Sequence, residues 1–130
     1  MNKLTTLVRN LKTSPFVSNI MINPIDATSN TIVCSVCVKE NYLNRHNTMH
    51  GGMTATLVDQ ITTLALENAK DVRGVSLNMS ISYLKPALAG DTLKITASVV
   101  RAGRRIAFLN CDILNSKGEL VAQGQHTKVI

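Results

Sequence analysis

The stretch HGGMTATLVDQITTLAL, residues 50–66, decides the fold because its apolar residues recur with helical spacing. The apolar face consists of Met53, Leu57, Ile61, Leu64 and Ala65, widened by Val58 and Leu66. The remaining positions are mostly small residues such as Thr56 and Thr63, whereas a surface helix normally has a charged side. The pattern therefore predicts a long helix, from about Gly51 to Ala69, that the rest of the chain covers on most sides.

Segments of alternating apolar and polar residues surround this helix and predict strands. In the clearest one, VSLNMSISYL, one face holds Val75, Leu77, Met79, Ile81 and Tyr83, and the other holds Ser76, Asn78, Ser80 and Ser82. Residues 31–39, 91–100, 106–114 and 120–128 show similar patterns. A weaker pattern predicts a strand over residues 16–22 that ends near Pro24.

The expected elements combine into one α+β domain over residues 1–130. The late strands are joined by short turns at residues 102–105 and 116–119, and short connections require antiparallel pairing. A stripe of Leu4, Leu7, Val8 and Leu11 predicts a short N-terminal helix. We therefore expect an antiparallel sheet that covers one long helix.

Composition limits the classes of function. Aromatic residues make up only 3% of the chain, which disfavours binding of single-stranded nucleic acid by ring stacking. No window approaches the roughly 20 apolar residues of a membrane-spanning helix. The net charge of +6 favours a polyanionic partner, but charge alone does not choose among nucleic acid, a membrane surface and a phosphorylated cofactor.

The cysteines and the N-terminus bear on location. Cys34 and Cys37 have the spacing of a metal or redox pair, but in a strand residues three apart point to opposite faces. We therefore expect free thiols in a reducing compartment. Residues 1–25 contain three basic residues and no acid, as in a mitochondrial targeting segment, but they also suit an ordinary helix. The prediction is a cytoplasmic protein, with a mitochondrial location as the alternative.

Asp59 is the only residue with a formal charge between Arg45 and Glu67. Its neighbours three and four positions away on the helix include no cation, and burying an unpaired carboxylate is costly. We interpret Asp59 as a general base, or as a carboxylate that orients and polarises a water molecule. The alternative is that it reaches solvent or pairs with a distant Arg or Lys.

The start of the same helix is a candidate site for an oxyanion. Asn44, His50 and Gly51 lie there, and glycine leaves the backbone N–H groups at the positive end of the helix dipole accessible. One such donor typically contributes about 3–4 kcal/mol to the stabilisation of an oxyanion. The alternative is that the two glycines only form a tight turn.

The spacing of Gly51 and Asp59 implies a second chain. The two residues lie eight positions apart, which is about 12 Å along a helix that rises ~1.5 Å per residue. A base and an oxyanion donor must both lie within about 3 Å of the reacting atoms. Two helices that run antiparallel about a two-fold axis could bring Asp59 of one chain to Gly51 of the other. If both residues are catalytic, the site is shared between two chains.

Together these residues resemble a known family. The resemblance rests on Asn44, His50-Gly51-Gly52, Asp59 and Gly74-Val75-Ser76, and it continues through GVSLNMSISYLKPA, GRRIAF and AQGQHTK over almost the whole chain. The pattern closely resembles the hotdog-fold acyl-CoA thioesterases. It is most similar to the group of thioesterase superfamily member 2 (acyl-CoA thioesterase 13), and more distantly to the bacterial phenylacetic-acid-degradation thioesterases.

The resemblance implies a fold, an assembly and a reaction. The fold is a long helix wrapped by a curved antiparallel sheet, assembled as homodimers and often as homotetramers. The reaction is hydrolysis of fatty acyl-CoA to free fatty acid and CoA, with no cofactor and no metal. Asn44 and the Gly51 N–H would hold the thioester oxygen, and His50 would support that loop or contact the thioester. Asp59 and Ser76 of the second chain would position and activate the water.

The resemblance also gives the positive charge a target, the phosphates of CoA. The implied CoA-binding residues are Tyr83, Lys85, Pro86, Arg101, Gly103, Arg104 and Arg105, with His126 and Lys128 as further candidates. The alternative for the arginines is that basic residues at a hairpin tip only protect a strand edge.

Two positions separate this chain from related patterns. Asn47 stands where the family usually has a glycine, and asparagine tolerates the positive φ that a glycine there would adopt. Hotdog-fold hydratases commonly carry a histidine five residues after the acid, where this chain has Leu64, so that reaction is disfavoured. The alternatives to a fatty acyl-CoA thioesterase are an aryl-CoA or acyl-carrier-protein thioesterase, or a non-catalytic module that binds acyl-CoA or nucleic acid.

Overall fold

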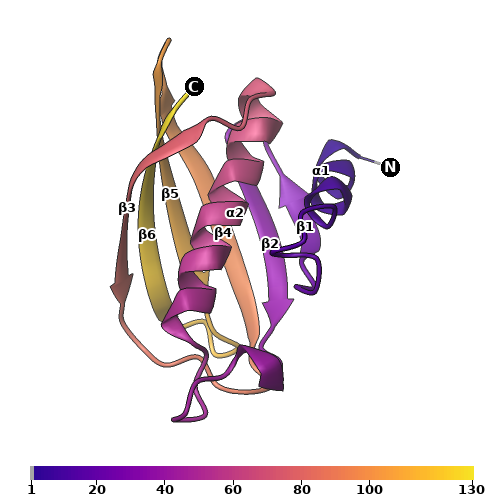
Figure 1. Ribbon diagram of the computed structural model, residues 1–130, viewed down its shortest axis with the longest axis vertical. Coiled ribbons are helices and arrows are strands. Elements are labelled where there is room, and N and C mark those ends of the chain that lie inside the picture. The colour runs from indigo at the N-terminus through magenta and orange to yellow at the C-terminus, as the bar shows by residue number, and fades with distance from the viewer. Residues whose placement is uncertain (1) are drawn as a thin grey trace.

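Helix α2 and a six-stranded antiparallel sheet dominate the computed structural model, which describes residues 2–130 (Figure 1). The helix spans Gly51–Lys70. The strands are β1 (Asn23–Ala27), β2 (Thr31–Cys37), β3 (Val75–Tyr83), β4 (Thr92–Ala102), β5 (Ile106–Leu114) and β6 (Leu120–Val129). They pair in the order β1-β2-β4-β5-β6-β3, and every pair is antiparallel. The predicted α+β architecture is confirmed.

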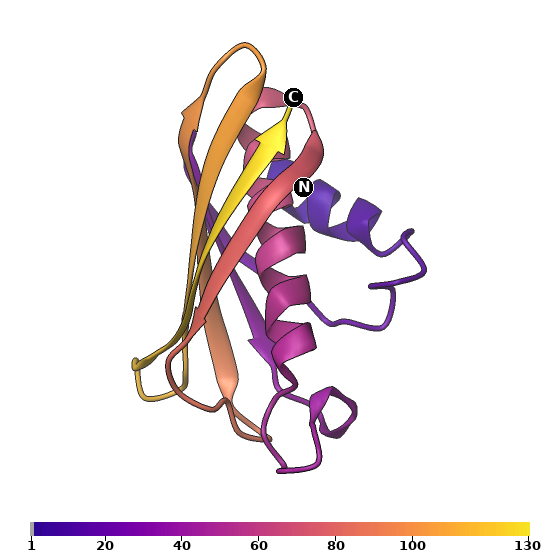
Figure 2. The ribbon, with the colours of Figure 1, turned by 60° about the vertical axis from the view of Figure 1, so that its left-hand side comes forward.

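Helix α2 lies along one face of the curved sheet (Figure 2). The predicted apolar face is the one that packs against the sheet, and Leu57, Ile61 and Leu64 have no exposed surface. Each such side chain contributes roughly 1.5–3 kcal/mol when fully buried. The opposite side of α2 is less covered than expected, because Thr56 and Thr63 remain half-exposed in a single chain.

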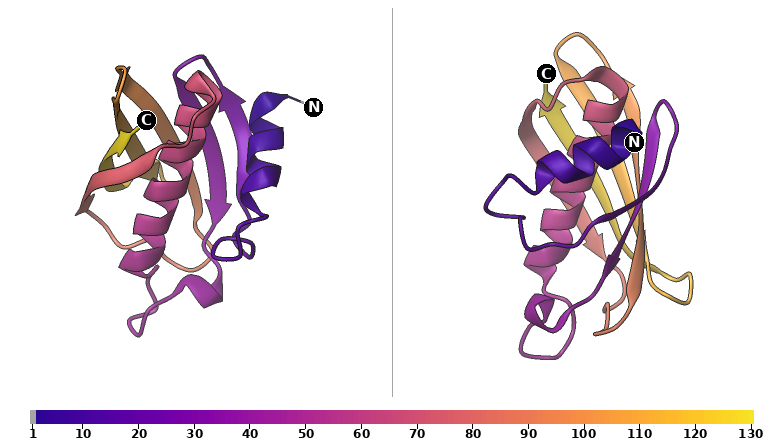
Figure 3. Two further views of the ribbon diagram at one scale, coloured as in Figure 1. Left: turned by 45° about the horizontal axis from the view of Figure 1, so that its top comes forward. Right: turned by 90° about the vertical axis from the view of Figure 1, so that its right-hand side faces the viewer.

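The N-terminal helix α1 (Lys3–Leu11) packs beside α2 (Figure 3). The Asn2 side chain caps it by accepting a hydrogen bond from the Thr5 N–H at 2.9 Å, and Leu4 and Val8 are its buried residues. The predicted strand over residues 16–22 is wrong, since residues 16–19 form turns and residues 20–22 have no regular secondary structure. The edge strand is β1 instead, which contains Pro24. A proline is tolerated there because an edge strand leaves one side without ladder hydrogen bonds, and the register shifts directly after it.

Strand β3 forms the other edge of the sheet and breaks the expected alternation. A bulge lies between Ser76 and Asn78, so that Ser76 pairs with Lys128 and Met79 pairs with His126. An extra residue shifts all later side chains to the other face relative to those before it. Ser76 therefore lies on the helix side of the sheet, and the prediction that it shares a face with Asn78, Ser80 and Ser82 is wrong.

The cysteines behave as the strand pattern predicted. Cys34 in β2 is buried and Cys37 is exposed, so their thiols point to opposite faces. All three cysteines are free. The two buried thiols are poor nucleophiles, because burial raises the pKa of Cys34 and of Cys111 to about 12.

Candidate active site

Asn44 closes the loop that precedes α2. Its Oδ1 accepts hydrogen bonds from the backbone N–H groups of His46 at 2.8 Å and Thr48 at 3.2 Å, which fixes the orientation of the amide. One Nδ2 hydrogen goes to the Thr48 hydroxyl at 3.0 Å. The other has no acceptor within residues 2–130 and is available to a ligand. Asn47 adopts a φ of 61°, so the loop keeps the backbone conformation expected at that position.

The N-terminus of α2 presents a second donor. His50 caps the helix, because its Nδ1 accepts a hydrogen bond from the Gly52 N–H at 3.1 Å and its carbonyl oxygen accepts one from the Met53 N–H at 2.9 Å. The Gly51 N–H is bonded to no other group in the described part of the chain. The predicted supporting role of His50 therefore has a geometric basis, and a contact with the thioester stays a prediction.

A cavity of about 320 Å³ opens beside these donors and brings together residues that the sequence assigned to two different roles. Its lining includes Asn44 and Gly51, and also Tyr83, Lys85 and Pro86. The Tyr83 hydroxyl donates to the Gly51 carbonyl oxygen at 3.0 Å, and Lys85 forms a salt bridge of 2.5 Å with Glu119. The hydrogen bond from Lys85 holds the pKa of the Glu119 carboxyl below its usual value. A phosphate at Lys85 would have to compete with this carboxylate.

Asp59 lies two turns further along α2, with 37% of its side chain exposed. Its Oδ2 accepts a hydrogen bond from Gln60 Nε2 at 3.1 Å, and its Oδ1 lies 3.9 Å from His126 Nε2, too far for a hydrogen bond. No cation lies within four residues of Asp59 on the helix, but β6 places His126 and Lys128 beside the carboxylate. The Asp59 oxygens therefore stay accessible to a water molecule while basic groups lie nearby.

Ser76, His126 and Thr62 form a hydrogen-bonded chain beside Asp59. Ser76 Oγ lies 2.7 Å from His126 Nε2, and His126 Nδ1 lies 2.8 Å from Thr62 Oγ1. His126 is 1% exposed and sits between α2 and the sheet. The pKa of the ring is lowered, chiefly by burial and then by the Lys128 cation, while the Asp59 carboxylate opposes the shift. The imidazole is therefore neutral at pH 7.

Lys128 is the second buried basic group, at 4% exposure. Its ammonium donates to the Thr63 hydroxyl at 2.7 Å, and burial lowers its pKa although Asp59 and Glu67 oppose the shift. His126 and Lys128 both occupy inward positions on β6, and this burial argues against the predicted contact with CoA phosphates. That contact stays a prediction.

The basic hairpin between β4 and β5 lies at the opposite end of the molecule from the N-terminus of α2 (Figures 1 and 2), where Gly51 borders the cavity. Arg101, Arg104 and Arg105 are exposed, and none forms a salt bridge within residues 2–130. The Gly103 N–H closes the turn by donating to the Ile106 carbonyl oxygen at 2.8 Å. One chain thus separates the predicted CoA-binding residues into two groups, one beside Gly51 and one at the far hairpin.

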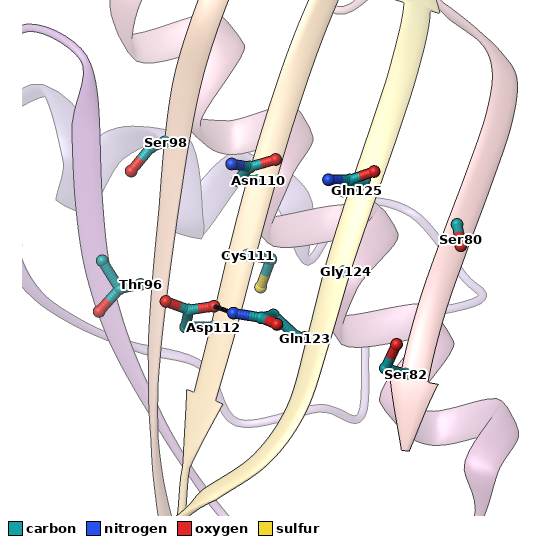
Figure 4. Close-up of a pocket in the computed structure, with 10 residues that line it drawn as sticks. All are labelled: Ser80, Ser82, Thr96, Ser98, Asn110, Cys111, Asp112, Gln123, Gly124 and Gln125. Carbon is teal, nitrogen blue, oxygen red and sulfur yellow. Dashed lines mark hydrogen bonds between the residues drawn. The ribbon is translucent and has the colours of Figure 1, made fainter. Parts of the chain in front are cut away.

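A hollow of about 450 Å³ on the outer face of the sheet contains none of the predicted residues (Figure 4). Hydroxyl and amide side chains line it, and its carboxylate, Asp112, accepts a hydrogen bond from Gln123 at 3.0 Å. Within residues 2–130 no three His, Cys, Asp or Glu side chains cluster as metal ligands would, and no helix is long and apolar enough to cross a membrane.

Comparisons with known proteins agree with this geometry. The family model described as "Thioesterase superfamily" matches residues 46–122, which include α2, β3, β4 and β5. The chain belongs to the Thioesterase superfamily. It is 42% identical to mouse acyl-coenzyme A thioesterase 13 over 106 residues, which cover 80% of this chain and 76% of the relative.

Solved structures of this superfamily share the whole fold. Zebra fish thioesterase superfamily member 2 superposes with a TM-score of 0.89 at 39% identity, covering 98% of this chain and 96% of that protein. The mouse thioesterase superfamily member 2 gives a TM-score of 0.85 at 36% identity, covering 99% of this chain and 98% of that protein. The predicted hotdog architecture and the family resemblance are confirmed.

Sequence reasoning missed the contacts that link Asp59 and Ser76 to the interior. It did not find Thr62 as a partner of His126, and it considered Lys128 only as a further candidate for CoA binding. A signal was present, because Ala122, Gly124, His126 and Lys128 alternate along the last strand and the first two are small. Polar side chains on the inward face of a strand indicate a buried polar cluster.

Proposed function

We propose that this chain is an acyl-CoA thioesterase that hydrolyses medium- and long-chain fatty acyl-CoA to free fatty acid and CoA. The observation that carries the proposal is a pair of N–H donors, one on Asn44 and one on Gly51, that border a single cavity and have no acceptor within residues 2–130. Asp59 lies two turns further along α2, and Ser76 of β3 is hydrogen-bonded to His126 beside it. The names of the related proteins support acyl-CoA as the substrate.

A homodimer formed by pairing of two β3 strands would complete the proposed site. Edge strand β3 carries no charged residue, and Val75, Leu77 and Tyr83 are more than half exposed. An exposed apolar edge of this kind promotes pairing with another strand. A second copy of β3 is the proposed partner, because antiparallel pairing about a two-fold axis would also bring the two α2 helices together. Assembly of such dimers into a homotetramer stays a prediction.

In the proposed site the thioester carbonyl oxygen accepts hydrogen bonds from the Asn44 amide and the Gly51 N–H. Both donors are held in place before substrate binds, Asn44 by the loop and Gly51 by the helix. Donors that are fixed in advance stabilise the negative charge that develops on the oxygen, by about 3–4 kcal/mol each. The dipole of α2 adds to this effect at its N-terminus.

The attacking water binds to Asp59 and Ser76 of the second chain. Its oxygen forms a bond to the carbonyl carbon while a proton passes to the Asp59 carboxylate, and the carbonyl π electrons move onto the oxygen. Collapse of this intermediate re-forms the carbonyl and breaks the carbon–sulfur bond. The CoA sulfur leaves as a thiolate, which the proton held by Asp59 can neutralise, and the fatty acid is released.

The CoA moiety is proposed to contact two groups of residues. Tyr83, Lys85 and Pro86 line the cavity beside the carbonyl site. The arginines of the β4–β5 hairpin lie at the far end of the same chain, so in an antiparallel dimer they would approach the cavity of the other chain. Their charge would pair with the CoA phosphates.

A panel of acyl-CoA esters tests the function. Release of free CoA should be fastest for medium and long fatty acyl chains, and Asp59→Asn should lower kcat by on the order of 10²–10⁴-fold. The matched control is Asp112→Asn, which changes a carboxylate on the outer face and should leave the rate unchanged. Binding of acyl-CoA without thiol release would show a non-catalytic module. Faster turnover of aryl-CoA or acyl-carrier-protein thioesters would replace the proposed substrate class.

A further inference from the structure

The direction of the hydrogen bonds around His126 follows from the single hydroxyl proton of Thr62. Thr62 Oγ1 lies 2.6 Å from the Val58 carbonyl oxygen, which can only accept, so the hydroxyl donates there. The same oxygen must therefore accept at its 2.8 Å contact with His126 Nδ1. Nδ1 carries the ring proton, and Nε2 keeps a lone pair. Ser76 consequently donates its hydroxyl proton to Nε2 at 2.7 Å.

We propose that His126 is a positioning residue for thioester hydrolysis, because it engages the Ser76 proton and so keeps the Ser76 oxygen as a hydrogen-bond acceptor. This inference rests on the proposed function. Asp59 and Ser76 then both accept from the attacking water, which directs its two O–H bonds to them and its lone pair to the thioester carbon. Ser76 loses no proton during the reaction, and the water proton goes to Asp59.

The surroundings of His126 keep Nε2 free for this task. The Asp59 carboxylate is 3.9 Å away, so it does not compete with Ser76 for the ring nitrogen. The charged groups that face the ring are Asp59 from α2 and Lys128 from β6, with Glu67 of α2 beyond Lys128. Strand β3 has no charged residue, and the carboxylate of β5, Asp112, lies on the outer face.

Protonation of His126 would reverse the direction of the hydrogen bond between Ser76 and His126 Nε2. An imidazolium donates from Nε2, so Ser76 would have to accept there and turn its own hydrogen towards the water. The water would then lose one of its two acceptors. Burial and the Lys128 cation lower the pKa of His126 and keep the ring neutral at pH 7. Hydrolysis should therefore fall in acid when this one ring is protonated.

Two amide substitutions of His126 distinguish the roles of its two ring nitrogens. The side chain of Gln places an oxygen near the position of Nε2, so His126→Gln can still accept the Ser76 proton. Asn reaches only the position of Nδ1, so His126→Asn can bond to Thr62 but not to Ser76. We expect His126→Asn and Ser76→Ala to lower kcat by a similar factor, on the order of 10²-fold, because a misdirected reactant has this effect. The kcat of His126→Gln should stay close to that of wild type. The double variant His126→Asn/Ser76→Ala should have a kcat no lower than that of either single variant.

The dependence of kcat on pH provides the second readout. The acid limb of wild type should include the protonation of His126, whereas His126→Gln should lack that contribution and keep activity to lower pH. A merely structural histidine would not move this limb once the variant is folded. Wild-type kcat in His126→Asn, or an unchanged acid limb in His126→Gln, would overturn the proposal.

The tautomer can be measured directly in wild-type protein labelled with ¹⁵N-histidine. The proposal requires that Nδ1 is protonated and Nε2 is not, and the opposite tautomer would overturn it even if His126→Asn fails to fold. Asp59→Asn separates this inference from the proposed function. An inactive Asp59→Asn together with a fully active His126→Asn would refute only the role of His126. A fully active Asp59→Asn would refute the proposed function itself.

Discussion

Mixing two inactive variants tests whether each active site uses two chains. Asn44 and Gly51 lie at the start of α2, whereas Asp59 lies eight residues further on, about 12 Å along the helix axis. Asn44→Ala removes one amide donor, and Asp59→Asn removes the carboxylate. If each site takes its donors from one chain and its carboxylate from the other, a mixed dimer has one site with both defects and one intact site.

The expected activity follows from counting sites. Random mixing of equal amounts makes about half of the dimers mixed, and each of these has one intact site out of two. The mixture should therefore show about one quarter of the wild-type rate, and mixed dimers isolated through two different tags should show about half. If each site lay within one chain, both sites of a mixed dimer would be defective and no activity would return.

The assay is release of free CoA from a fatty acyl-CoA, followed with a thiol-reactive dye. A blank without substrate corrects for the exposed thiol of Cys37. The matched control mixes Asp59→Asn with Ser76→Ala, which both alter the water-binding side, so this mixture should stay inactive. Absence of rescue in isolated Asn44→Ala/Asp59→Asn mixed dimers would refute the shared site.

Three further predictions concern CoA binding, packing and pH. Arg104→Ala with Arg105→Ala should raise the KM for acyl-CoA far more than that for acyl-pantetheine, and an equal effect on both would argue against phosphate binding. Gly124→Ala should lower the free energy of unfolding by about 1–3 kcal/mol, because the new Cβ would lie 2.6 Å from a methyl group of Val58, which is buried in α2. Denaturant titrations measure this change. Gly103→Ala is the control, because its new Cβ would make only an ordinary contact of 3.6 Å. The lowered pKa of His126 means that the unfolded chain binds more protons below pH 6.5, so stability should fall as pH drops through this range and fall less steeply in His126→Gln. Equal slopes for both proteins in unfolding experiments at several pH values would contradict this reasoning.

Sequence periodicity predicted most of the fold but not its irregularities. The helical spacing of residues 50–66 and the alternation in β5 and β6 gave those elements to within a residue or two. The strand expected over residues 16–22 was wrong, because its apolar residues Val17, Ile20 and Ile22 are buried from turns and irregular backbone instead. The bulge after Ser76 was missed because a single extra residue leaves no trace in an alternating pattern.

The candidate site divides in the same way. Local patterns were sufficient to single out Gly51 and Asp59 as candidates, because a glycine-rich helix start and a lone carboxylate on an apolar helix are unusual within their own neighbourhoods. The role of Asn44 came from the family resemblance, and all three roles stay predictions. The role of His126 was not predictable, because its partners lie 50 and 64 residues away in the sequence. Pairing across the sheet, which no short segment encodes, decides such contacts.

The sequence by itself determined the long apolar helix, the antiparallel strands and the position of one acid within that helix, since these depend on spacing between near neighbours. Only the tertiary structure decided which way Ser76 faces and which basic groups lie beside Asp59. The physical reason is that a strand register is set by the packing of the whole sheet against α2, and a shift of one residue exchanges the two faces of the strand.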